Sequence, residues 1–220
     1  CTDAVIEHRI RRGFVGCLDP NPLVAGKGAQ ILRDAGIEVE TGVCEAECRE
    51  INEVFFHYIT HKTPFVVLKY AMTLDGKIAA HTGDSRWVTG EAARRHVHET
   101  RIRLSGIMVG VGIVLADDPL LTCRIDGGRN PVRIVCDSHA RTPLGSQLVQ
   151  TANEIPTYVA VTARSERTAA LEEKGVRILV CAEMDGHVDL TDLMQQLGSA
   201  GINGILLEGG SSLAFSALKA

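Results

Sequence analysis

Short apolar runs alternate with polar, helix-forming segments through the chain from residue 65 onward. Strands are expected at residues 65–70, 107–109, 132–137, 157–161, 177–180 and 204–207, where Val, Ile and Leu dominate. Helices are expected at residues 91–104, 165–174 and 190–197, the last with Asp189 as its N-cap. Strands that alternate with helices in this way predict a mostly parallel sheet with helices on its faces.

The first 60 residues alternate in the same manner. We expect a strand at 13–18, a helix through 29–33 that ends at Gly36, a strand at 37–40, and one amphipathic helix from 44 to 59. The polar segment 60–64 ends in proline and predicts a domain boundary, with domains at 1–60 and 61–220. Because the chain begins and stops inside apparent helices, we expect it to be a fragment.

Composition narrows the classes of partner. Lys and Arg total 23 against 27 Asp and Glu, a net charge of −4, so nothing indicates a nucleic-acid or anionic-membrane partner. No apolar run reaches roughly 18 residues, and no signal-peptide pattern is present. Seven scattered cysteines, an odd number, favour reduced thiols in a cytoplasmic protein.

Three expected strand ends carry residues suited to ligand binding. Glu208-Gly209-Gly210 follows strand 204–207 and leads into a helix that begins with serine, so backbone N–H groups there can meet an anion. The other two ends are segment 71–77, which contains Asp75, and the glycine pair 110 and 112 before Asp117. Strand ends of a parallel sheet share one edge, which predicts a single site for a phosphorylated small molecule or a dinucleotide. A third glycine is missing, so the common Rossmann fingerprint is disfavoured.

Cations and one aromatic residue leave alternatives open. Arg101 and Arg124 are candidates for a substrate phosphate, although their spacing alone favours surface arginines. Trp87 either stacks on a ring or fills the core. Lys69 lies within an apolar strand and points either to an anionic partner or to solvent. Neither a nucleophile elbow nor a phosphate loop with Gly-Lys-Ser/Thr occurs, so hydrolase and kinase chemistry is not supported.

Taken together, the motifs resemble the bifunctional riboflavin-biosynthesis deaminase/reductase family over essentially the whole chain. The matching strings occupy residues 1–4, 19–28, 74–79, 83–89, 114–119 and 208–210. The resemblance implies an α/β fold, in which a dihydrofolate-reductase-like domain, truncated at its C-terminus, follows the C-terminal part of a cytidine-deaminase-like domain. Cys1 matches the last zinc ligand of that deaminase. The other ligands and the glutamate would precede residue 1, so we expect deamination from the parent protein and not from this chain.

For the reductase, the resemblance implies hydride transfer from NADPH to C1′ of the opened sugar of 5-amino-6-(5-phosphoribosylamino)uracil, giving a ribityl chain. The implied NADPH-binding residues are Ala71, Trp87, Ile113, Asp117, Ser138, Gly210, Ser211, Ser212, Leu213, Ala214, Phe215 and Ser216. The implied substrate-binding residues are Ser85, Arg101, Leu121, Arg124 and Glu208. Relatives often have threonine where Ile113 stands, so a side-chain hydrogen bond is not expected there.

The candidate catalytic residues are Lys69, Asp117 and Glu208, and Asp118 is a further proton-donor candidate. The family is commonly oligomeric, so we expect a homo-oligomer that binds a small phosphoribosyl pyrimidine. Two alternatives remain. One is a catalytically silent nucleotide-binding scaffold, and the other is a single-function pyrimidine or pterin reductase.

Overall fold

The apolar runs expected as strands in the second part of the chain form one sheet in the computed structural model, which describes residues 1–85 and 87–220. Arg86, within the string 83–89, lies outside the described residues. The chain divides into two compact units, Cys1–Phe65 and Val66–Ala220. The division follows the polar segment 60–64 directly and lies at residue 65, where the sequence pattern placed it at 60.

The first unit contains a two-stranded parallel sheet and four helices among its described residues. Its elements are α1 (Thr2–Glu7), β1 (Arg12–Val15), α2 (Lys27–Asp34), β2 (Glu38–Thr41), α3 (Glu45–Ile51) and α4 (Glu53–His61). Arg12 pairs with Glu38 and Val15 with Thr41. Gly36 follows α2 with φ +79°, the left-handed conformation expected of it.

The single helix expected at 44–59 is wrong, because the chain breaks at Asn52 into α3 and α4. The Asn52 backbone N–H donates to the carbonyl of Arg49, while its side-chain amide donates to the carbonyl of Cys48 at 2.8 Å. The side chain thus replaces the backbone donor that a continuous helix would supply, which is how asparagine interrupts helices.

The second unit is built on a six-stranded sheet in the order β3-β10-β4-β5-β6-β7. The pairings from β10 through β7 are all parallel, which confirms the expected α/β class. The strands of this sheet are β3 (Phe65–Lys69), β4 (Gly106–Gly110), β5 (Val132–Cys136), β6 (Thr157–Val161), β7 (Arg177–Val180) and β10 (Gly204–Glu208). Its helices are α5 (Glu91–Arg103), α6 (Val111–Asp117), α7 (Gln147–Gln150), α8 (Glu166–Glu173), α9 (Leu190–Ser199) and α10 (Ser211–Ala217). A short antiparallel pair, β8 (Glu183–Met184) and β9 (His187–Val188), completes the unit.

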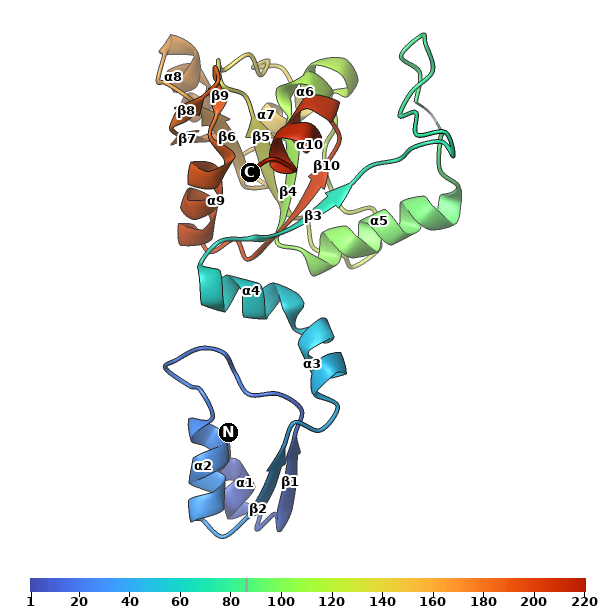
Figure 1. The fold of residues 1–220 in the computed structure, drawn as a ribbon. Coiled ribbons are helices and arrows are strands. Elements are labelled where there is room, and N and C mark those ends of the chain that lie inside the picture. Colours follow the sequence, from blue (N-terminus) through green and yellow to red (C-terminus); the bar gives the residue numbers. More distant parts are fainter. Residues whose placement is uncertain (86) are drawn as a thin grey trace. The chain divides into compact units, whose positions relative to one another are not determined.

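Figure 1 shows the ribbon of this sheet with its helices around it. Two apolar clusters of side chains cover the two faces of the sheet. Successive strand residues alternate between them, so Met108 packs with α9 while Val109 packs with α6, α7 and α8. Leu193 and Leu197 of α9 are fully buried in the cluster that contains Met108. Side chains from both faces therefore hold the ends of β4 and β10 in place, and those ends form the site.

Two local expectations have different outcomes. Asp189 caps α9 as expected, since its carboxylate accepts the N–H of Thr191 at 2.8 Å. The glycine turn expected at residues 110–112 is wrong, because β4 ends at Gly110 and α6 begins at the next residue. Gly110 is the extended N-cap of α6, whose Val111 and Val114 are buried against the sheet. In the described ranges, no helix has the length and apolar character needed to cross a bilayer.

Candidate functional site

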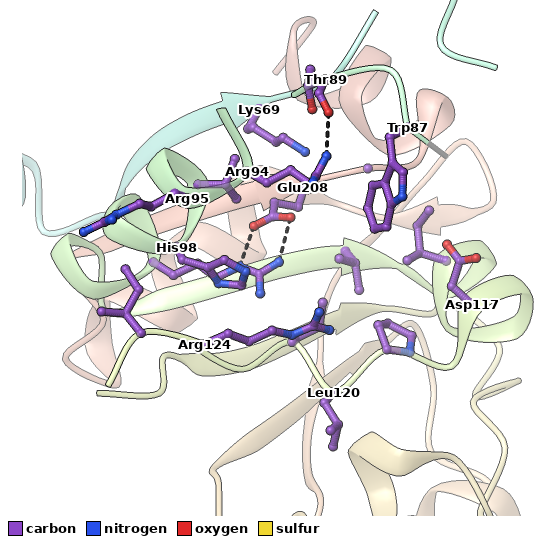
Figure 2. Close-up of a pocket in the computed structure, with 18 of the residues that line it drawn as sticks. Lys69, Trp87, Thr89, Arg94, Arg95, His98, Asp117, Leu120, Arg124 and Glu208 are labelled. Carbon is purple, nitrogen blue, oxygen red and sulfur yellow. Dashed lines mark hydrogen bonds and ion pairs between the residues drawn. The ribbon is translucent and has the colours of Figure 1, made fainter. Parts of the chain in front are cut away.

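The ends of β3, β4 and β10 meet at a cavity of about 1000 Å³ (Figure 2). Lys69 from β3, Val109 from β4 and Glu208 from β10 contribute to its wall, together with residues of α5, α6 and α7 and of the segments before α5 and after α6. The predicted convergence of strand ends is therefore present. Asp75 does not line the cavity, because it lies in an exposed turn where it pairs with Lys77 at 2.6 Å.

An ion pair between Arg101 and Glu208 joins α5 to the end of β10. Arg101 Nε and Nη2 donate to the two carboxylate oxygens at 2.7 and 2.9 Å, and Nη1 donates to the carbonyl of Thr122 at 2.7 Å. The side chains are only 11% and 12% exposed. A bidentate pair of this kind is strong and fixes both planes, so it defines the shape of this wall. The two residues expected to bind substrate therefore also bind each other.

His98 lies one turn before Arg101 on α5 and lines the same wall. Burial lowers the pKa of His98, the charges of Arg101 and Arg124 lower it further, and Glu208 opposes them. The ring is therefore neutral at pH 7. His98 is not among the residues predicted from the sequence, because it belongs to no motif there. The spacing of three residues to Arg101 on one helix face was the available signal.

Trp87 lies at the cavity wall and is 70% exposed, so the core alternative is wrong. The Arg94 guanidinium carbon lies 4.5 Å from the centre of its ring, and Arg94 Nη1 donates to the carbonyl of Thr89 at 2.8 Å. Such a cation–π contact orients an exposed aromatic ring. Arg94 was not among the predicted residues.

Of the two adjacent aspartates, Asp118 has a structural role. It ends α6 with φ +40°, and its carboxylate accepts the N–H of Gln147 at 2.8 Å, where α7 begins. The Gln147 side chain also donates to the Asp118 carbonyl. Asp117 lines the cavity beside Ile113, whose side chain packs so closely on Gly209 that a Cβ there would lie 3.2 Å from it.

The remaining predicted residues divide into two groups. Lys69, Ser85, Leu121 and Arg124 line the cavity, which favours the ligand-facing alternative for Lys69. Ala71, Ser138 and residues 210–216 are not among the lining residues. Ser138 Oγ instead accepts the N–H of Val188 at 3.1 Å.

The glycines at the end of β10 approach β4 closely. Gly209 and Gly210 have φ of +76° and +87°, conformations that favour glycine. A Cβ on Gly210 would lie 3.9 Å from the backbone nitrogen of Gly110. Residues 210–216 therefore begin where β4 and β10 both end, next to the cavity residue Gly209.

The residues present do not form a metal site. No group of three or more His, Cys, Asp or Glu able to hold an ion exists among the residues that the structure describes. Cys1 is exposed and precedes α1 as its N-cap. A zinc ion needs three or four such ligands, so we derive no chemistry from zinc in this chain.

The family model that matches this chain and two of its curated relatives carry the same family name. The family model described as the RibD C-terminal domain matches residues 64–220. The chain is 53% identical over 220 residues to the riboflavin biosynthesis protein RibD of Actinobacillus pleuropneumoniae, covering 100% of this chain and 58% of that protein. For RibD of Aquifex aeolicus the identity is 43%, with 100% and 60% covered.

Among solved structures, the diaminohydroxyphosphoribosylaminopyrimidine deaminase/5-amino-6-(5-phosphoribosylamino)uracil reductase of Thermotoga maritima matches with a TM-score of 0.84 and 38% identity. That match covers 100% of this chain and 59% of the solved one. The chain thus spans about three fifths of the length of the relatives that it matches.

Proposed function

The chain belongs to the RibD C-terminal domain family, and on that premise we propose that it reduces the ribosyl group of 5-amino-6-(5-phosphoribosylamino)uracil to the ribityl form with NADPH, in riboflavin biosynthesis. One observation carries the proposal. Three strand ends, a basic helix face and an exposed tryptophan surround one cavity of about 1000 Å³, large enough for a nicotinamide ring and a phosphosugar together.

The residues at the wall fit both ligands. Trp87, Ile113 and Asp117 line the cavity, and we assign them to the cofactor by family resemblance. On the same ground we assign Ser85, Leu121, Arg124 and the pair Arg101–Glu208 to the substrate. We assign the cofactor phosphates to residues 210–216 and further cofactor contacts to Ala71 and Ser138, by family resemblance. When bound, NADPH supplies the hydride.

The chain then has to align the nicotinamide C4 with C1′ of the sugar and to exclude water from the site. The Arg101–Glu208 pair fixes the substrate wall, and Arg94 holds the Trp87 ring. Lys69 Nζ and the Asp117 carboxyl are the candidates to hold a proton near C1′ of the sugar. Both Glu208 oxygens accept from Arg101, so we assign Glu208 to positioning Arg101 against the substrate. A protonated Schiff base at C1′ would need no strong acid beside it.

For the longer protein that the relatives represent, we propose two activities, this reduction and a zinc-dependent deamination of the preceding pyrimidine. The relative from Thermotoga maritima carries both activities in its name. We further propose that the protein is a cytoplasmic homo-oligomer.

The decisive assay follows NADPH oxidation by the 220-residue chain with 5-amino-6-(5-phosphoribosylamino)uracil. We expect turnover, and a loss of at least about 100-fold in kcat for whichever of Lys69→Met and Asp117→Asn removes the group that holds the proton. NADPH binding without turnover would favour the silent scaffold. Turnover with a dihydropterin but not with this pyrimidine would favour a different reductase.

A further inference from the structure

One corner of the cavity contains a histidine ring that the reaction proposed above does not use. His98 lines this corner with Arg101, Arg124 and Glu208, and Figure 2 shows His98, Arg124 and Glu208 there. Its Nδ1 is buried and has no hydrogen-bond partner among the described residues. Buried polar atoms without partners are few in folded proteins, and those that exist often mark functional sites.

The loop opposite His98 is attached to the same helix. The Cys123 thiol lies 3.9 Å from the carbonyl oxygen of His98, and Arg101 donates to the carbonyl of Thr122. These contacts hold the segment that carries Arg124 against the turn of α5 that carries His98. The histidine and the two arginines are therefore held at one corner by the fold itself.

The fixed charges at this corner are fewer than a phosphate group requires. Glu208 neutralises Arg101 through its bidentate pair, which leaves Arg124 as the further positive charge of the corner. A phosphomonoester carries about −1.5 to −2 at pH 7. With a neutral His98, the corner offers a net charge of about +1 to a ligand that carries nearly −2.

We propose that His98 takes up a proton from solvent when a phosphomonoester dianion binds at this corner, so that the imidazolium adds a second positive charge to that of Arg124, beside the neutral Arg101–Glu208 pair. The inference rests on the proposed function, because it gives the phosphate of that substrate its binding site. Because Nδ1 is buried, it keeps its hydrogen in both states, and the proton from solvent adds to Nε2, the ring nitrogen that meets the phosphate oxygens. No bond of the ligand forms or breaks.

The surroundings of His98 account for a switch between the two protonation states. In the free site, burial and the two arginines disfavour the charged ring. A bound dianion reverses the balance, because a negative charge then lies beside the ring. The other charged groups that line the cavity are Lys69 from β3, Glu91, Arg94 and Arg95 from α5, and Asp117, Asp118 and Asp126 from the segment that ends α6 and follows it.

The direct test is an NMR titration of the His98 ring in the 220-residue chain, from about pH 8 to about pH 5, without ligand and with saturating ribose 5-phosphate. We expect the midpoint of the His98 titration to lie at least about one pH unit higher with the ligand. An unchanged midpoint would overturn the proposal. This measurement needs no substitution, so it does not depend on the folding of a variant.

Binding of sulfate provides a second readout, because sulfate stays a dianion across this pH range. We expect sulfate to bind about tenfold more tightly near pH 6 than near pH 8. His98→Asn and His98→Gln should bind with less than about a twofold change between the same pH values. The matched control is His96→Asn on the same helix, whose side chain is 79% exposed and which should behave as the unsubstituted chain does. A variant at His98 that keeps the full pH dependence would overturn the assignment.

The same chemistry occurs twice in the proposed reaction, in the substrate phosphate and in the 2′-phosphate of NADPH. Adenosine 2′-monophosphate therefore serves as the competing probe. If ribose 5-phosphate moves the titration midpoint of His98 further, the corner binds the phosphate of the substrate. If adenosine 2′-monophosphate moves it further, the assignment to the substrate phosphate is overturned. The NADPH-oxidation assay tests the proposed function independently of this inference. Absence of turnover with a displaced His98 midpoint contradicts only the proposed function, and turnover with an unmoved midpoint contradicts only this inference.

Discussion

Arg101 and Arg133 belong to the same domain, but the groups that compensate their positive charges differ. Arg101 pairs with a carboxylate at the cavity wall. Arg133 on β5 is fully buried and donates to four backbone carbonyls and two threonine hydroxyls, those of Thr151 and Thr157. Burial lowers the pKa of Arg133 to about 10, which leaves it charged at neutral pH. Its bonds to the carbonyls of Leu120 and Leu148 tie the cavity loop to α7.

Replacing Arg133 with methionine should destabilise the domain by about 3–5 kcal/mol, because buried carbonyls lose their donors and the methionine restores only apolar packing. Urea unfolding measures the change. Arg129→Met, at an exposed position, should stay within about 0.5 kcal/mol. Equal stability of the two variants would contradict the role given to Arg133.

Glu208→Gln should cost about 2 kcal/mol of unfolding free energy, since it leaves the charge of Arg101 uncompensated at a site that is about one tenth exposed. The matched control is Glu172→Gln, which breaks the pair with Arg164 at 61% and 38% exposure and should cost less than about 1 kcal/mol. Denaturant midpoints with unchanged slopes distinguish the two effects. A loss at Glu208 no greater than at Glu172 would refute the structural importance of the pair.

At the scale of elements, the short connections shape the site. β4 passes directly into α6, α6 ends at the left-handed Asp118, and Asp118 starts α7 through Gln147. The strands themselves follow from local apolar runs. Their connections depend on single side chains, such as Asn52 and Asp118, whose partners the apolar pattern does not indicate.

Asp118→Ala should destabilise the domain by about 1–2 kcal/mol, from the lost cap of α7 and the strained left-handed conformation. It should also lower kcat, because the preceding residue, Asp117, lines the cavity. Asp118→Asn keeps the acceptor and tolerates the conformation, so it should retain both properties. Thermal melts and NADPH oxidation of the two variants provide the comparison, and a defective Asn variant would show that the charge matters instead.

Helix α4 should weaken in acid. Burial, followed by the neighbouring His61, lowers the pKa of His57 from its ordinary value of 6.5. The unfolded chain therefore binds the proton more readily, so stability should fall as the pH decreases below about 6.5. We expect His57→Gln to reduce the loss of melting temperature between about pH 7 and pH 5. His81→Gln, at an exposed position, should leave that loss unchanged, and an equal effect of the two would refute the role of His57.

At the scale of the molecule, the family match and the structural division coincide closely. The match begins at residue 64, and the second compact unit begins at Val66. The cavity is lined entirely by residues of this second unit. The reductase chemistry that we propose is therefore a property of one unit.

A chain of residues 64–220 should consequently fold alone and bind NADPH within about threefold of the affinity of the 220-residue chain, because no cavity residue is lost. Near-UV circular dichroism and cofactor titration report the two properties. A fragment without a cooperative melt would show that unit 1 is required for folding of the second unit.

The sequence by itself determined the parallel α/β class, the six strands of the main sheet and the strand ends that carry Lys69 and Glu208, because burial patterns along a strand or helix are local properties. It also indicated Arg101, Arg124 and Asp117 as ligand-binding candidates through a family resemblance. Only the tertiary structure decided that Arg101 pairs with Glu208, 107 residues away, that Arg133 is buried, and that His98 faces the two arginines. Such contacts depend on strand order and helix packing, which bring distant residues together and leave no periodic signal in the chain.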